Sequence, residues 1–231
     1  MLAVSNIKAF HGETQALFGV SLTVGQGEAV ALLGANGAGK TTMLRSILGL
    51  TPPRSGAISF AGADITRAPT DAIARLGIGW VPEDRRVFPS LTVATNLRLG
   101  MKKSPYRTWT LGDCYTLFSA LEYLQDRECE NLSGGEMQMV SISRAMLGGP
   151  GLMLMDEPSQ GLAPKLVQDV MKSVARMKSE GVAVILVEQH ALSALRVTDR
   201  AYVLDKGRIV HEGASQALLD DAPLRQRLLG G

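Results

Sequence analysis

The sequence has little of what marks secreted or membrane-spanning proteins. Only two cysteines occur, Cys114 and Cys129, and their spacing fits neither a metal site nor a disulfide framework. We therefore expect two reduced thiols, as in most cytosolic proteins. Residues 1–10 lack the basic region and long apolar stretch of a signal peptide, and no apolar run approaches the roughly 20 residues that span a bilayer. These absences predict a cytoplasmic protein that reaches a membrane only peripherally, through other proteins.

An excess of charge of one sign is also missing. The chain carries 24 basic and 22 acidic residues, a formal net charge of +2, and neither half forms a polybasic arm. No nucleic-acid partner is therefore expected. With 231 residues, 45% of them hydrophobic, the chain is large enough for one buried core with a smaller lobe attached.

The apolar pattern alternates between strand-like and helix-like segments. The segments 27–33, 152–156 and 182–188 consist mostly of continuous apolar runs, which are typical of strands covered on both faces. Helical periodicity follows the first two runs, at residues 40–50 and 164–181. This order predicts an α/β fold with a mainly parallel sheet and helices packed against it.

Two regions depart from that alternation. The first 24 residues favour strands joined by a turn, which we interpret as an N-terminal antiparallel β subdomain. From about residue 92 the strand signal vanishes and helical patterns dominate. We predict one domain, residues 1–231, in which a helical subdomain (about 92–149) is inserted into a core made of residues 1–91 and 150–231.

A glycine-rich loop lies between the first buried strand and its helix. Gly34 to Thr41 reads GANGAGKT and matches the P-loop pattern G-x-x-x-x-G-K-[ST]. Backbone N–H groups must surround a phosphate closely, and glycine allows the approach and the positive φ angles. The helix that begins here adds free N–H groups and its positive dipole end.

The side chains of this loop have separate expected roles in a P-loop NTPase core. Lys40 would reach the β- and γ-phosphates, the Thr41 hydroxyl would ligate Mg²⁺, and Thr42 would lie near the α-phosphate. The expected phosphate-binding residues are Gly34, Ala35, Asn36, Gly37, Ala38, Gly39, Lys40, Thr41 and Thr42.

Two adjacent carboxylates follow the apolar run LMLM. Asp156 and Glu157 end a predicted core strand, where acidic residues are seldom buried without a partner. Asp156 would hold the metal ion, directly or through water. Glu157 would then be free to polarise the water that attacks the γ-phosphate. A solvated acidic turn is the alternative interpretation.

The stretch NLSGGEMQ, residues 131–138, predicts a second helix start. Ser133 and Glu136 have the spacing of a capping box, but two glycines in a first helical turn are locally poor choices. They make sense if a phosphate must come close, at an anion site formed by Ser133, Gly134, Gly135 and Glu136. One P-loop does not need two such sites, whereas two chains facing head to tail would each complete the other's nucleotide site.

This combination resembles the ATP-binding subunit of ATP-binding cassette (ABC) transporters over essentially the full chain. The matching motifs are GANGAGKT (34–41), LSGGE (132–136), MDEP (155–158) and SQGLAP (159–164). The resemblance implies an ATPase that binds ATP and Mg²⁺, with two subunits closing around two ATP molecules. It also implies that the helical subdomain contacts transmembrane permease subunits.

A narrower resemblance is to the LivF-type subunit of branched-chain amino-acid importers. It is carried by VPEDRRVFPSLTV (81–93), LVEQH (186–190), GLAP and a terminal LGG. Such systems usually pair two different ATPase subunits with two membrane proteins and a periplasmic solute-binding protein. Related subunits serve importers for amides, urea and aromatic acids, so the solute and the identity of the second ATPase stay open.

Three positions depart from the general ABC pattern. His11, with Phe10 as the alternative, stands where an aromatic residue normally stacks on adenine, although a turn histidine without a role would look the same. Glu83 replaces a metal-sensing glutamine; a carboxylate remains a good ligand, but EDRR could also be a solvated charge run. Gln189 aligns with the switch histidine, with His190 one place late, and Gln cannot carry positive charge.

Two other classes compete with the transporter interpretation. ABC proteins outside transport usually carry a long coiled-coil insert or two cassettes, and this chain has neither. A nucleotide kinase would use the P-loop, but that interpretation would explain neither the LSGGE segment nor Glu157.

The roles argued above give one set of expected site residues. Lys40, Glu157 and Gln189 are the expected catalytic residues, and Thr41, Glu83 and Asp156 are the expected metal ligands.

Overall fold

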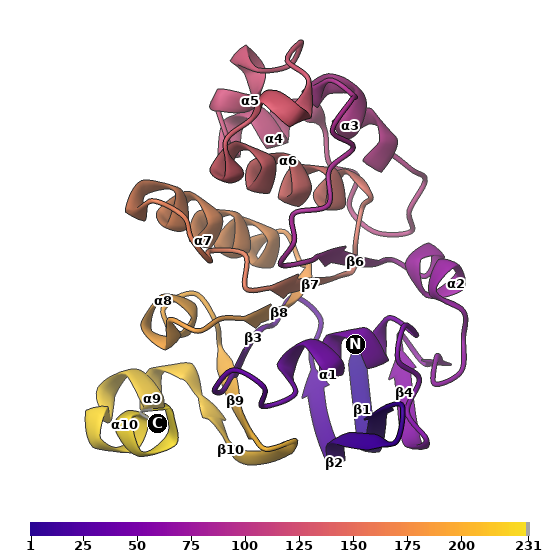
Figure 1. Ribbon diagram of the computed structural model, residues 1–231, viewed down its shortest axis with the longest axis vertical. Helices are drawn as coiled ribbons and strands as arrows, with labels where there is room; N and C mark the ends of the chain where they lie inside the picture. The colour runs from indigo at the N-terminus through magenta and orange to yellow at the C-terminus, as the bar shows by residue number, and fades with distance from the viewer. Residues whose placement is uncertain (230–231) are drawn as a thin grey trace.

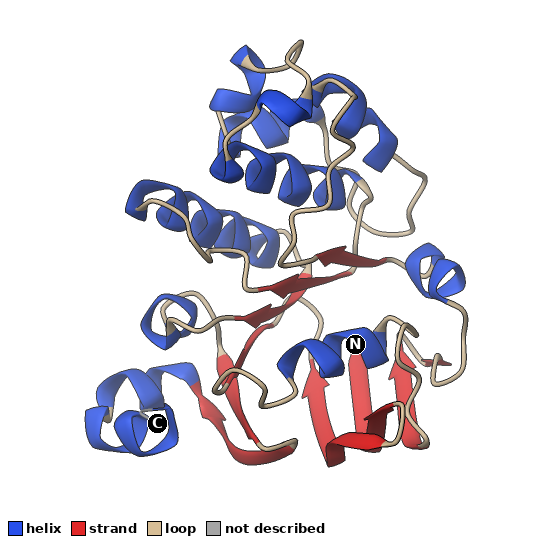
Figure 2. Cartoon of the chain, viewed as in Figure 1, coloured by secondary structure: helices blue, strands red, loops and turns tan. Residues whose placement is uncertain are grey.

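The computed structural model describes residues 1–229, so the last two glycines of the terminal LGG lie outside the described residues. The described part contains two sheets with helices packed around them (Figures 1 and 2). Within that part, no helix combines the length and the apolar character needed to cross a bilayer. Cys114 and Cys129 are both buried and unbridged, as expected for reduced thiols.

The larger sheet contains most of the apolar runs of the sequence. Its strands are β3 (Ala29–Leu33), β6 (Ile78–Val81), β7 (Leu152–Asp156), β8 (Ala183–Val187), β9 (Arg200–Asp205) and β10 (Arg208–Ala214). Their order across the sheet is β10-β9-β3-β8-β7-β6. All neighbours pair in parallel except β10, which forms an antiparallel hairpin with β9. Every residue of β3, β7 and β8 is buried, which is why these strands are apolar throughout.

The smaller sheet is wholly antiparallel. Its strands are β1 (Leu2–His11), β2 (Thr14–Val24), β4 (Ser55–Phe60) and β5 (Ala63–Asp64), in the order β2-β1-β4-β5. Alternating buried and exposed residues along β2 show that one face covers the core. The predicted N-terminal β subdomain therefore exists, and it gains β4 and β5 from the region that follows the P-loop.

Helices cover both faces of the larger sheet and extend beyond one of them (Figure 2). Those beside the sheets are α1 (Lys40–Ile47), α2 (Thr70–Arg75), α7 (Pro164–Ser179), α8 (Ala191–Leu195), α9 (Ser215–Asp220) and α10 (Ala222–Leu229). Between β6 and β7 the chain forms α3 (Val93–Gly100), α4 (Leu111–Leu117), α5 (Ala120–Tyr123), a 3₁₀ turn (Cys129–Asn131) and α6 (Gly134–Leu147). The loss of strand pattern after residue 92 therefore corresponds to helices; α2 had no clear sequence signal.

The larger sheet separates two apolar cores. Side chains alternate across β3, so Ala31 faces the core shared with α3, α6 and α7, whereas Leu32 faces the core shared with α1, β1 and β2. Strand β7 alternates in the same way, with Met153 toward the first core and Leu154 toward the second. Because this sheet is covered on both sides, its polar residues are concentrated at the strand ends.

The carboxyl ends of four parallel strands meet at one edge of this sheet. The P-loop follows β3, Glu83 follows β6, Glu157 follows β7 and Gln189 follows β8. Ladder partners such as Asp156 and Val187 fix the relative heights of these ends. In α/β proteins this edge is where ligands bind, and the fold brings together residues such as Asn36 and Gln189, which are 153 positions apart in sequence.

Candidate nucleotide site

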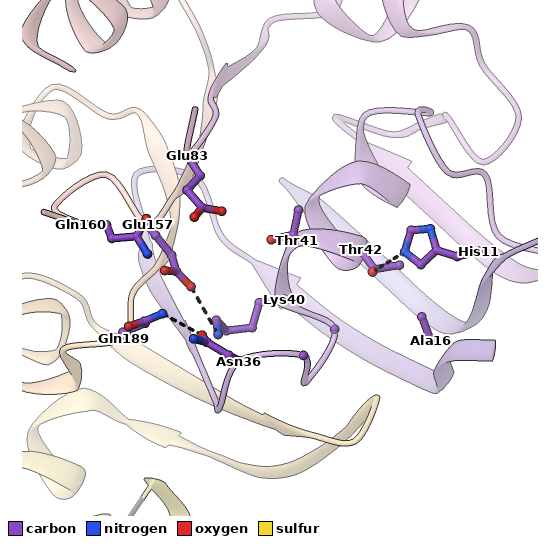
Figure 3. A pocket seen from close by; sticks show the side chains of 12 residues that line it. His11, Ala16, Asn36, Lys40, Thr41, Thr42, Glu83, Glu157, Gln160 and Gln189 are labelled. Atoms are coloured by element: carbon purple, nitrogen blue, oxygen red, sulfur yellow. Dashed lines mark hydrogen bonds and ion pairs between the residues drawn. The ribbon is translucent and has the colours of Figure 1, made fainter. Parts of the chain in front are cut away.

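A cavity of about 430 Å³ lies at this edge of the sheet. That volume is within the usual range for small-molecule sites, about 300–1,000 Å³. Figure 3 shows the polar side chains that point into it from the P-loop, α1 and the ends of β1, β6, β7 and β8. The lining residues are His11, Ala16, Asn36, Gly37, Gly39, Lys40, Thr41, Thr42, Glu83, Glu157, Gln160 and Gln189.

The P-loop backbone needs glycine at specific positions. Gly34, Gly37 and Gly39 have φ angles of 148°, 78° and 108°, which residues with a side chain rarely adopt. A Cβ at Gly34 would also collide with the carbonyl oxygen of Leu204. Gly39 is the N-cap of α1 and offers no side-chain acceptor, so the first N–H groups of α1 lack a side-chain cap. The loop therefore presents backbone donors and a helix dipole to the cavity.

Lys40 is buried, with 5% of its surface exposed. Its Nζ donates to the carbonyl oxygens of Gly34 (2.9 Å) and Ala35 (3.1 Å) and lies 3.5 Å from Glu157 Oε1. A buried ammonium needs such acceptors, and a phosphate would satisfy it better because the phosphate carries full negative charge. The side chain thus lies at the cavity wall, in reach of an anionic ligand.

Three carboxylates gather opposite the P-loop. Asp156 accepts a hydrogen bond from Thr41 Oγ1 (3.3 Å), and Glu157 and Glu83 both line the cavity. Burial, together with the like charges of Glu157 and Glu83, raises the pKa of Asp156 to about 6, although the Thr41 hydrogen bond and the Lys40 charge oppose the shift. Crowded carboxylates of this kind are stabilised by a cation.

The same oxygen donors fit a hard metal ion that a nucleotide brings with it. In residues 1–229, no three His, Cys, Asp or Glu side chains are close enough to form a metal site alone. Mg²⁺ commonly binds through one or two carboxylates together with substrate phosphates and water. The Thr41 hydroxyl and Asp156 carboxylate, already in contact, match that incomplete donor set.

The residue after the metal candidate has an unusual backbone. Glu157 has φ 47°, in the left-handed region, and is 9% exposed. Its N–H donates to the Val187 carbonyl (3.0 Å), and its own carbonyl accepts from the Gln160 N–H (3.1 Å). Strained conformations at non-glycine residues occur often at functional sites, where the surroundings hold them in place.

A further carboxylate contacts the turn that begins at Glu157. Glu188 is buried and accepts a hydrogen bond from the Ser159 N–H (3.0 Å). Burial raises the pKa of Glu188, and the hydrogen bonds with Ser159 oppose that shift. Sequence reasoning missed Glu188, although an acidic residue directly after a buried apolar run was a usable signal.

The structure distinguishes the two residues at the end of β8. Gln189 lines the cavity and donates from Nε2 to Asn36 Oδ1 of the P-loop (2.7 Å). His190 is the N-cap of α8 and lines a different cavity, which Gln189 also borders, together with Leu192, Arg225 and other residues of α8 and α10. Gln189, not His190, therefore lines the cavity formed by the P-loop.

The two aromatic candidates on β1 also differ in position. His11 lines the cavity, and its Nε2 is 2.9 Å from Thr42 Oγ1. Phe10 faces elsewhere: the Arg54 guanidinium stacks on its ring, 4.1 Å from the ring centre. Of the two, His11 is the one that lines the cavity beside the P-loop.

Comparison with known proteins decides the family. Residues 17–160 match the family model described as ABC transporter. The chain belongs to the ABC transporter family. The high-affinity branched-chain amino acid transport ATP-binding protein BraG of Pseudomonas aeruginosa is 42% identical over 234 residues, covering 100% of both chains. The lipopolysaccharide export system ATP-binding protein LptB of Escherichia coli K12 is 33% identical over 228 residues, covering 96% of this chain and 94% of LptB.

A solved structure of another ABC cassette has the same fold. The ATP-binding cassette MJ0796, a dimer in a post-hydrolysis state with ADP and Pi, superposes with a TM-score of 0.82 at 26% identity, covering 93% of this chain and 99% of that one. The expected P-loop NTPase fold, with its two sheets and inserted helices, is therefore confirmed. As a member of this family the chain is an ATPase that binds ATP.

The ABC signature residues lie apart from the P-loop in this chain. Ser133 is the N-cap of α6: its Oγ accepts from the Glu136 N–H (3.3 Å), and its N–H donates to Glu136 Oε2 (2.7 Å), which is the predicted capping box. Neither Ser133 nor Glu136 lines the cavity. Figure 1 shows α6 and α1 on opposite sides of the larger sheet. One chain alone therefore does not bring the signature residues to the P-loop cavity.

The signature glycines have close neighbours within the chain. A side chain on Gly134 would collide with the Arg85 guanidinium, and one on Gly135 would collide with Leu166 of α7. Neither glycine has a positive φ angle. Part of the reason for glycine here is thus packing against the core, in addition to the phosphate approach inferred from sequence.

Proposed function

We propose that this chain is the ATPase subunit of an importer for branched-chain or related amino acids. ATP binding would close a dimer of two such subunits, hydrolysis would reopen it, and transmembrane permease subunits would follow these movements. The observation that carries the proposal is the full-length match to BraG, whose name assigns it to branched-chain amino acid transport. The chain would act at the cytoplasmic face of the membrane, and a periplasmic solute-binding protein would supply the solute.

The residues that line or adjoin the cavity support a separate role for each of them in ATP hydrolysis. Lys40 and the N–H groups of the P-loop would bind the β- and γ-phosphates, and Thr41, Asp156 and Glu83 would hold Mg²⁺. When bound, the metal ion neutralises phosphate charge that develops during transfer. Glu157 would accept a proton from the attacking water, and Gln189 would hydrogen-bond that water or the γ-phosphate.

In this proposal, each nucleotide site is completed by a second ATPase subunit when the dimer closes. The signature residues Ser133, Gly134, Gly135 and Glu136 would contact the nucleotide held by the P-loop of a second ATPase subunit, identical or paralogous. The separation of α6 from the P-loop within one chain supports this arrangement. The dimeric ADP-bound form of MJ0796 supports it independently.

A surface hollow supports contact with a permease. It lies where residues 92–149, the proposed helical subdomain, meet the core, and has a volume of about 430 Å³. Trp80, Phe88, Leu99 and Arg144 are among its lining residues. Phe88 is 50% exposed and Leu99 57% exposed, which leaves apolar surface for a partner to cover.

Uptake by cells that lack this gene tests the proposal. Cells would be complemented with the parent gene or with Glu157→Gln, and entry of labelled leucine, isoleucine and valine would be measured. We expect uptake to depend on the parent gene and to be lost with Glu157→Gln, because the variant cannot complete the ATP cycle. Labelled urea, acetamide and benzoate would be measured in parallel.

The parallel measurements separate the competing solutes. Loss of urea, amide or aromatic-acid uptake with intact leucine uptake would assign the chain to another importer. The 33% identity with LptB makes an exporter the second candidate. Unchanged uptake of every solute, together with co-purification of integral membrane proteins, would favour export over import.

A further inference from the structure

Arg85 lies where three parts of the proposed machinery meet. It follows Glu83 by two residues on the loop after β6, and its Nη2 donates to the Gln160 carbonyl oxygen (2.6 Å). Its Nη1 occupies the space that a side chain on Gly134, at the start of α6, would need. The Arg85 guanidinium therefore contacts both the turn after β7 and the signature helix, whereas the Arg85 backbone is part of the loop that contains Glu83.

This position is energetically costly. The backbone of Arg85 has φ 52°, in the left-handed region that residues with a side chain rarely occupy. A cation beside the N-terminus of a helix is also repelled by the positive end of the helix dipole. The contacts of the guanidinium must outweigh both costs, so the position of Arg85 is held by specific interactions.

The adjacent arginine shows what an ordinary surface residue does here. Arg86 forms an ion pair with Asp84 (2.8 Å) on the same loop and lies over the Trp80 ring, 5.7 Å from its centre. Among the described residues its side chain has no hydrogen bond to Gln160 and is not next to Gly134, although Arg86 and Gln160 both line one surface hollow. The EDRR run thus contains one solvated arginine and one that connects distant segments.

The contact with Gln160 leads directly to the catalytic candidate. Gln160 closes the turn that begins at Glu157, through the hydrogen bond from its N–H to the Glu157 carbonyl (3.1 Å). The same residue lines the nucleotide cavity. Arg85 therefore holds the far end of the turn that keeps Glu157 in its left-handed conformation.

We propose that Arg85 is a positioning residue that joins the Glu83 loop, the Glu157 turn and the signature helix into one unit. A shift of the signature helix changes the space at Gly134, moves the guanidinium and so moves the Gln160 carbonyl. Placement of the second phosphate site is thereby linked to placement of the water-activating carboxylate. This inference rests on the proposed function, because it takes Glu157 and the signature residues in those roles.

Arginine suits this role better than lysine. The planar guanidinium has several N–H donors in a fixed fork, so it can bind the Gln160 carbonyl with one nitrogen and pack against Gly134 with another. A lysine ammonium is a single donor point on a flexible stem and can keep only the first of these contacts.

Steady-state kinetics of the full chain with MgATP test the inference. The variants are Arg85→Ala, Arg85→Met, which keeps length but removes the donors, and Arg85→Lys. Arg86→Ala and Arg86→Met are the matched controls. We expect kcat of the Ala and Met variants at Arg85 to fall about tenfold, the usual effect of losing one hydrogen bond from a charged donor.

The division between kcat and KM distinguishes positioning from general damage. Arg85 does not line the cavity, so KM for ATP should stay close to the parent value in its variants. Arg85→Lys should recover part of the lost kcat, and both Arg86 variants should match the parent. Thermal unfolding would identify a variant that fails to fold, in which case Arg85→Met and Arg85→Lys carry the comparison.

Clear outcomes would overturn the inference. Parent-like kcat in folded Arg85→Met, or equal losses in the Arg85 and Arg86 variants, would show that the contact with Gln160 positions nothing. A proportional rise in KM would place Arg85 in nucleotide binding instead. If the parent chain, alone and with its membrane partners, hydrolyses no ATP, the proposed function fails first, which is distinguishable from failure of the Arg85 inference.

Discussion

Two helix starts in this protein carry adjacent or near-adjacent glycines, but the glycines serve different physical needs. Before α1, Gly34, Gly37 and Gly39 adopt positive φ angles, so the backbone conformation itself excludes other residues. At the start of α6, Gly134 lacks a positive φ angle, and a Cβ there would require only the Arg85 guanidinium to move. The first loop is therefore shaped by local conformation and the second by what packs against it.

The two helix starts also differ in how their polar groups are engaged within the chain. At the P-loop, Lys40 is held by carbonyl groups of its own loop, and the helix start has no side-chain cap. At the signature, Ser133 is already engaged in a capping box with Glu136. The P-loop is thus open to a phosphate, whereas the Ser133 hydroxyl can accept its cap and still donate to a phosphate.

The largest expected effect tests whether ATP hydrolysis depends on Glu157, which lies beside the P-loop. Glu157→Gln should leave ATP affinity close to that of the parent but lower turnover by about 10²–10⁴-fold, the usual contribution of a general base. Equilibrium ATP binding and steady-state hydrolysis measure the two quantities. Glu122→Gln, the same change at an exposed site on α5, is the control.

A Glu157→Gln variant that hydrolyses ATP at the parent rate would remove Glu157 from the mechanism. The comparison between the two helix starts would then lose its chemical half, because Glu83, the other carboxylate that lines the cavity among the described residues, has the proposed metal role. A matching loss in Glu122→Gln would instead point to a nonspecific effect of the substitution.

The second prediction tests the two uses of glycine directly. Gly34→Ala should lower the free energy of unfolding by about 1–3 kcal/mol or more, because its φ of 148° strains any side chain and the new Cβ meets the Leu204 carbonyl. Gly134→Ala should change it by less than about 1 kcal/mol, because alanine favours helix and only the flexible end of Arg85 must move. Urea unfolding of both variants measures the difference, and equal losses would contradict it.

The third prediction concerns the switch position beside the P-loop. Gln189→Ala should lower kcat about tenfold, the effect of one lost hydrogen bond to a charged group, because Gln189 contacts the loop through Asn36. His190→Ala should hydrolyse ATP at nearly the parent rate, since His190 lines another cavity. Hydrolysis by the assembled transporter is the measurement, and the reverse pattern would assign the switch to His190.

The smallest expected effect concerns the base. His11→Ala should weaken ATP binding by about 0.5–1.5 kcal/mol, which is the typical size of a stacking contribution. Phe10→Ala should leave affinity nearly unchanged, because Phe10 stacks with Arg54 away from the cavity. Calorimetric titration with ATP can resolve the two variants. A larger loss for Phe10→Ala would transfer the base contact to that residue.

Much of the fold followed from local patterns. Fully apolar runs marked β3, β7 and β8 because strands covered on both faces need no alternation. The capping box at Ser133 was readable because its two partners are three residues apart. Helix α2 and the Glu188 contact were missed, since a short helix and a buried acid give weak signals in isolation.

Sequence by itself determined the P-loop, the acidic strand end and the signature helix start. Each depends on residues adjacent in the chain, through backbone angles, capping or strand periodicity. Only the tertiary structure shows that Gln189 and His11 line the cavity, that Phe10 does not, and that the two arginines of EDRR make different contacts. These placements depend on contacts across large separations, such as Arg85 with Gln160, 75 positions apart, and only the packed sheet brings such partners together.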